Sequence, residues 1–137
     1  MDITITFDKD RWTIDPEPAI VTRGTEIRWV FRAPKSQFRN LRWVIRFSKT
    51  SPFRDVYEVR VKTTNTGFGT YNPVQDSVRK TLESLGLGQE ADFDHRGSTK
   101  PVTAENPGDH KYVVRVDNDD TNSEIASEDP IVRVVAE

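Results

Sequence analysis

The most constraining feature of this sequence is a two-residue alternation of apolar and polar side chains. In residues 25–32, for example, Ile27, Trp29 and Phe31 share one face, while Arg28 and Arg32 share the other. The alternation occupies residues 2–8, 25–32, 41–48, 55–62 and 110–116, and residues 130–136 are rich in β-branched side chains. Successive side chains of a β-strand point to opposite faces, so this period is typical of strands with one face on a core. We therefore expect an all-β chain.

Turn-forming residues separate these stretches and indicate how the strands are connected. The turns are marked by Arg23-Gly24, Ala33-Pro34, Ser51-Pro52, Asn106-Pro107-Gly108 and Asp129-Pro130. Seven or eight short antiparallel strands of this kind predict a β-sandwich. A chain of 137 residues is the size of one domain, so we expect residues 1–137 to form a single domain whose core contains Trp29 and Trp43.

One segment departs from the alternation and predicts a short helix. Val74, Val78, Leu82 and Leu85 follow the spacing of one helical stripe. Within residues 72–86, Asn72 suits the N-cap, Pro73 the first helical position and Gly86 the C-terminal end. Residues 86–106 are predicted to form a loop.

Composition and charge narrow the possible partners. Hydrophobic residues make up 34% and charged residues 31% of the chain, and no apolar stretch has the length of a membrane span, which predicts a soluble protein without a membrane partner. Residues 1–7 lack the basic start and apolar run of a signal peptide, so the default expectation is the cytoplasm. A net charge of -2 makes nucleic acid an unexpected partner.

The charge is unevenly distributed along the chain. Residues 1–65 hold 13 basic and 8 acidic side chains, a net charge of +5, and the remaining residues have a net charge of -7. Either the two halves interleave and neutralise each other, or they form faces of opposite sign that take part in docking or self-association. Interleaving is the favoured interpretation.

Two segments of the sequence resemble cupredoxin-like domains. The first is "FDKDRWTIDPEPAIVTRGTEIRWVFRAP", in which Gly24 precedes a strand whose alternating apolar residues face the core. The second is "PGDHKYVVRV", followed by a variable stretch and by "DPIVRVV" as a closing strand. The resemblance implies a β-sandwich with Greek-key connections.

The copper chemistry of that family is not expected here. Copper in cupredoxins is held by two His, a Cys and usually a Met. The position that matches the Cys is Val116, residues 117–128 contain no His or Met, and residues 32–40 contain no His. We therefore expect no copper, no other metal and no cofactor.

The acidic stretch after Val116 leaves one metal hypothesis open. Its polar residues have the spacing of a calcium-binding loop: Asp117, Asp119, Thr121, Ser123 and Glu128. However, Asn122 stands where such loops need Gly, so a solvated hairpin loop is the favoured interpretation. A second acidic stretch, with Glu90, Asp92, Asp94 and His95, is likewise predicted to be an exposed loop.

Catalytic constellations are not evident in the sequence. The chain has only two histidines, His95 and His110, and His110 is expected to be structural, at the start of an edge strand. There is no phosphate-binding glycine loop with its lysine and no nucleophile elbow. We therefore expect that the protein is not an enzyme.

Two kinds of binding remain, and the sequence favours association with a protein. Arginines lie on the predicted polar faces of the strands: Arg28, Arg32, Arg42, Arg46 and Arg60. Arg42 and Arg46 are the predicted interaction residues, for a protein partner or for self-association, because arginine is common in interfaces and sandwich edges pair readily. The alternative is a glycan or small ligand held by aromatic residues in or near loops: Phe38, Phe53, Phe68, Tyr71 and Phe93.

Overall fold

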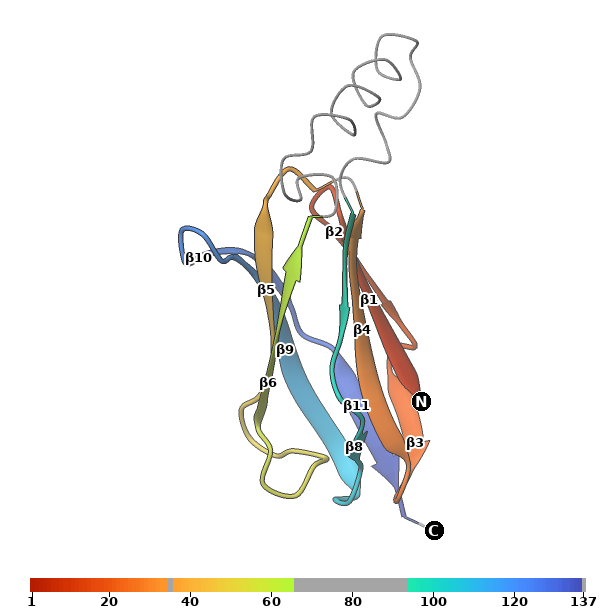
Figure 1. The fold of residues 1–137 in the computed structure, drawn as a ribbon. Coiled ribbons are helices and arrows are strands. Elements are labelled where there is room, and N and C mark those ends of the chain that lie inside the picture. Colours follow the sequence, from red (N-terminus) through yellow and green to blue (C-terminus); the bar gives the residue numbers. More distant parts are fainter. Residues whose placement is uncertain (35, 66–93, 137) are drawn as a thin grey trace, which may run out of the picture.

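The computed structural model describes residues 1–34, 36–65 and 94–136, which form eleven β-strands and no helix (Figure 1). In chain order the strands are β1 (Asp2–Asp8), β2 (Arg11–Asp15), β3 (Ala19–Thr22), β4 (Glu26–Pro34), β5 (Asn40–Phe47), β6 (Glu58–Thr64), β7 (Asp94–Ser98), β8 (Val102–Thr103), β9 (Gly108–Asn118), β10 (Ser123–Glu128) and β11 (Ile131–Val135). A helix able to cross a membrane is therefore not found in these three ranges.

The strands form two sheets that pack face to face around one core (Figure 1). The first sheet has the order β2-β1-β4-β7, with β8 added to β4, and the second has the order β3-β11-β9-β5-β6, with β10 added to β9. The all-β prediction is confirmed, and the two layers have the arrangement of a β-sandwich.

The prediction of purely antiparallel sheets is wrong. β1 pairs with β4 in parallel in the first sheet, and β3 pairs with β11 in parallel in the second. The chain leaves β2 for β3 in the other sheet and then returns as β4, so β4 runs in the same direction as β1. Side-chain alternation fixes which face is buried but says nothing of the direction of a partner strand.

The segment from residue 86 to 106 was predicted to be a loop, and its described part contradicts this. β7 and β8 lie there, and both pair with β4. The sequence signal was weak because β7 is short, polar and contains Gly97. The predicted helix over residues 72–86 lies outside the described residues.

Large aromatic side chains fill the space between the sheets, as the alternation predicts. Trp29 and Trp43 are both fully buried. The ring of Trp29 lies 5.5 Å from that of Phe53 and 5.6 Å from that of Tyr112, and its Nε1–H donates to the Tyr112 hydroxyl at 3.3 Å. Burial raises the pKa of Tyr112, so this hydroxyl stays neutral and can take part in hydrogen bonds across the physiological pH range.

A chain of buried hydrogen bonds links the two sheets near Trp43. Its Nε1–H donates to Thr63 Oγ1 at 2.8 Å, and Thr63 Oγ1 lies 3.0 Å from His95 Nδ1. His95 Nε2 lies 2.8 Å from the Phe38 carbonyl oxygen, which can only accept, so the ring proton is on Nε2 and Nδ1 accepts from Thr63. His95 is fully buried, and its prediction as part of an exposed loop is wrong.

Replacing Thr63 by valine should lower the free energy of unfolding by about 1–3 kcal/mol. Valine keeps the shape but removes the hydroxyl that both buried rings contact, so the Trp43 Nε1–H loses its acceptor. Urea unfolding of the two proteins measures the difference. Thr63→Ser is the matched control because it keeps the hydroxyl, and a valine variant as stable as the serine variant would contradict the role of this hydroxyl.

Candidate interaction surface

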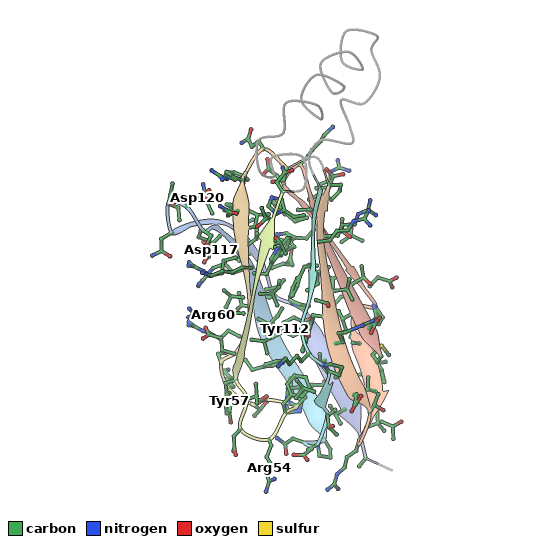
Figure 2. All side chains as sticks on the ribbon, in the orientation of Figure 1. Arg54, Tyr57, Arg60, Tyr112, Asp117 and Asp120 are labelled. Carbon is green, nitrogen blue, oxygen red and sulfur yellow. The ribbon has the colours of Figure 1, made fainter. Side chains whose placement is uncertain are left out.

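The predicted interaction residues lie on the face of the second sheet that points away from the first, which we call the outer face. It is formed by alternate residues of three neighbouring strands: Arg42, Val44 and Arg46 of β5, Glu58, Arg60 and Lys62 of β6, and Val113, Arg115 and Asp117 of β9. In Figure 2, Asp117 and Arg60 lie on this side of the sandwich, and Tyr57 lies below them, toward the lower end. The structure thus places Arg42 and Arg46 on one face, as expected from their two-residue alternation along β5.

Arg42 is held in a network of hydrogen bonds rather than pointing into solvent. Its guanidinium donates to Asp117 at 2.8 Å, to Asp119 at 3.3 Å and to Asn122 at 2.6 Å. Its side chain is only 17% exposed, and that of Asp117 only 3%. Arg115 also donates to Asp117, at 2.9 Å. Arg42 therefore anchors the turn between β9 and β10 to β5.

Arg46 and Arg60 share one carboxylate and remain largely exposed. Both donate to Glu58, at 2.9 Å from Arg46 and 3.2 Å from Arg60. The hydrogen bond from Arg60, followed by that from Arg46, holds the pKa of Glu58 below its usual value against the opposing effect of desolvation. The arginine side chains are 54% and 55% exposed, so two accessible guanidinium groups are balanced by one anion.

An apolar residue lies beneath this charged layer. Val44 faces outward between Arg60 and Arg115 in the strand register, yet it is only 1% exposed. Arginine stems commonly cover apolar surface while their charged ends reach water. The outer face is therefore a charged layer over an apolar centre.

The acidic stretch after Val116 forms a hairpin and not an open loop. β9 continues to Asn118, four residues make the turn, and β10 returns along β9. The carboxylates of Asp117 and Asp119, two positions of the calcium-like spacing, both form ion pairs with Arg42. Asp117 also pairs with Arg115, and Asp119 also pairs with Lys62. Across the three described ranges, no group of three or more metal-ligating side chains comes together.

Both histidines are buried and hydrogen-bonded. His110 lies in β9, which is an interior strand between β11 and β5, so its predicted place on an edge strand is wrong. Its Nδ1 lies 2.8 Å from the Thr50 hydroxyl and its Nε2 lies 2.8 Å from the Asn106 carbonyl oxygen. Its predicted structural role agrees with these contacts.

The loop aromatics of the alternative hypothesis do not form one described site. Phe53 is buried in the core, and Phe38 is partly buried against it. Phe68, Tyr71 and Phe93 lie outside the described residues. Sequence reasoning missed Val56 and Tyr57, which are exposed directly before β6, because the alternation over residues 55–62 puts Tyr57 on the same face as the partly buried Val59 and Val61.

A hollow of about 290 Å³ lies at the end of the sandwich where Phe38 is found. Its lining residues are Phe7, Lys9, Asp10, Pro34, Ser36, Gln37 and Phe38. The lining combines two aromatic rings with charged and amide side chains, which can stack on and hydrogen-bond a small polar ligand. This hollow is the described feature that fits the alternative hypothesis.

Comparison with known proteins does not assign the chain to a family. No protein-family model matches the sequence, and a search of curated proteins also finds no match.

Proposed function

We propose that this protein is a non-catalytic binding or assembly module that recognises an acidic protein surface through Arg46 and Arg60. One observation carries this proposal: two arginines, each more than half exposed, share the single carboxylate of Glu58. Lys62 is 72% exposed beside them, with its Nζ 3.6 Å from Asp119. An anionic partner would neutralise this excess, and arginine is enriched in protein interfaces.

Exposed apolar residues at the lower end of the same strands support a protein as the partner. Val56 and Tyr57 precede β6, and the Tyr57 carbonyl accepts from the Phe47 amide of β5. Tyrosine and arginine, with tryptophan, are enriched among the residues that contribute most to interface energy. The hydrogen bonds of His95 and His110 support a non-catalytic role, because both rings have structural partners.

The finer fold proposed is a cupredoxin-like Greek key without a copper site. β5 and β6 form a hairpin, and β9 reaches the other side of β5 only after the chain has visited β7 and β8 in the first sheet. Such a long return beside the first strand of a hairpin supports a Greek-key connection.

A small-ligand or glycan-binding domain is the second proposal, based on the hollow that includes Phe7 and Phe38. The two proposals place the binding residues on different parts of the sandwich. The following experiment separates them.

Replacing both Arg46 and Arg60 by glutamate should abolish binding of the protein partner. In an affinity pull-down, proteins bound by the parent chain should be lost with this variant, since three carboxylates would then lie where Glu58 now binds two arginines. The variant also loses two exposed ion pairs to Glu58, each worth about 0.2–1 kcal/mol, so circular dichroism should show a folded protein with a modestly lower melting temperature.

The matched control reverses two exposed arginines elsewhere, Arg23 and Arg28; the latter is paired with Asp2 on the first sheet. This control should keep the partners. Partners that survive reversal of Arg46 and Arg60 would refute the proposed surface, and loss of a small ligand on Phe38→Ala would favour the second proposal.

A further inference from the structure

In the part of the second sheet that includes β10, the two edge strands are β6 and β10 (Figure 1). Across this part the strands follow the order β6, β5, β9, β10. Among the described strands, β6 pairs only with β5 and β10 pairs only with β9. An unpaired edge is a template for a strand of another chain.

The backbone hydrogen bonds show which groups of β6 point away from the sheet. The Phe47 amide donates to Tyr57, and the Asn65 amide donates to Arg39, so odd-numbered residues of β6 bond to β5. The even-numbered residues, including Arg60 and Lys62, therefore present their N–H and C=O groups to the outer edge.

The same reasoning applies to β10. The Asp119 amide donates to Asn40, so odd-numbered residues of β9 bond to β5 and even-numbered residues bond to β10. Ser127 stands opposite Arg115, so its backbone groups point away from β9. Within the described residues, both edges thus present backbone groups that no neighbouring strand binds.

The charge changes sign from one edge to the other along a single row of the outer face. The row that crosses the four strands consists of Lys62, Arg42, Asp117 and Glu124. Its cationic end is on β6 and its anionic end is on β10, which also carries exposed Glu128. A copy placed beside the first, with its β10 level with β6, brings its Glu124 next to Lys62, which also lies 3.6 Å from Asp119 of its own chain.

Each edge strand also carries partly buried apolar side chains, and one of those on β6, Val61, packs against Gly97 of β7. These are Val59 and Val61 on β6 and Ile125 and Ala126 on β10, all packed against the core. They face the interior side of the sheet, where no charge of β6 opposes the approach of another strand.

Charge favours one of the possible pairings of two copies. An antiparallel β6–β6 contact sets Arg60 opposite Lys62 when it is centred on Val61, and opposite Glu58 when it is centred on Val59, where Glu58 is already bound by Arg46 and Arg60 of its own chain. A β10–β10 contact centred on Ala126 sets Glu124 opposite Glu128, and like charges directly opposite are destabilising. A β6–β10 contact sets lysine against glutamate. In one continuous sheet β10 runs antiparallel to the next β6, because β6 has the direction of β9.

We propose that a second copy of this chain adds its β10 to the β6 edge of the first, which extends the second sheet from one molecule to the next. This inference rests on the proposed role in association and names the partner as the chain itself. The contact joins two different surfaces, so it leads to open chains of molecules unless the rotation between copies closes a ring. The bulge between Glu124 and Ala126 adds twist at each contact.

The experiment measures the mass of the protein in solution against its concentration by sedimentation and light scattering. We expect a mass that rises past that of a dimer without a plateau and that falls at high salt, because the edge charges are exposed and screened. Lys62→Glu and Glu124→Lys should each weaken association about fivefold, as expected for loss of a cross-strand charge pair. The two changes in one chain should restore it.

Lys100→Glu is the control with the same charge change at an exposed site outside both edges, and it should leave association unchanged. Stronger association of the Lys62→Glu variant would indicate a β6–β6 dimer and overturn the proposal. A parent chain that stays monomeric, or a combined variant as weak as the single ones, would overturn it as well. A pull-down with Arg46 alone reversed, which lies on β5 and outside both edges, tests the proposed function separately, so the two can fail independently.

Discussion

Replacing Trp29 by alanine is expected to lower the free energy of unfolding by about 3–5 kcal/mol, the cost of truncating a large aromatic residue in a core. Trp29 is fully buried and its ring packs against those of Phe47, Phe53 and Tyr112. The alanine variant would leave a cavity among these rings and would remove the hydrogen bond to the Tyr112 hydroxyl. Such a loss approaches the whole stability of many domains.

Urea unfolding followed by far-ultraviolet circular dichroism measures the effect. Trp29→Phe is the matched control, since it keeps an aromatic ring in the core and removes the Nε1–H. We expect it to lie between the parent and the alanine variant. An alanine variant that unfolds at the parent's urea concentration would contradict the central place of Trp29.

Replacing Asp117 by alanine is expected to cost about 2–3 kcal/mol. Breaking a buried ion pair by removing one partner costs about 3–5 kcal/mol, and we expect less here because Arg42 and Arg115 are partly exposed. Arg42 would keep Asp119 and Asn122 but would lose its shortest bond to a carboxylate. The hairpin of β9 and β10 should therefore open more readily than the rest of the sheet.

Amide hydrogen exchange tests this local effect. Val116 stands opposite Ala126 in the part of β9 that bonds to β10, so its amide should exchange faster in the variant. Asp120→Ala is the control, because Asp120 is exposed in the turn and accepts only from Asn40 among the described contacts of its side chain. Equal exchange in both variants would mean that Asp117 does not hold the hairpin.

The buried and exposed faces of the strands were predictable, because the two-residue alternation of apolar and polar side chains depends only on neighbouring residues. Trp29, Trp43 and Val114 are buried, as the alternation requires. The parallel pairs were not predictable, because direction depends on where the chain crosses between sheets. β7 escaped prediction because its buried residue is His95, whose burial depends on Thr63 in a distant strand.

The candidate surface was predictable only in part for the same reason. The sequence correctly grouped Arg42 and Arg46 on one face of a strand. It could not separate their roles, because Asp117 is 75 residues from Arg42 and meets it only through the register of β5 and β9. Arg46 binds Glu58, which is only 12 residues away in the sequence and lies on the paired strand β6, and Arg46 stays exposed.

The parallel pairing of β3 with β11 has a consequence for synthesis of the protein. β3 has no strand partner other than β11 among the described strands, and β11 is made more than 100 residues later. While the chain is being translated from its N-terminus, residues 19–22 therefore lack their hydrogen-bonding neighbour until Val135 has left the ribosome. The second sheet can be completed only after β11 has emerged, so ribosome-bound chains that end before Ile131 should expose the β3 edge to proteases and chaperones.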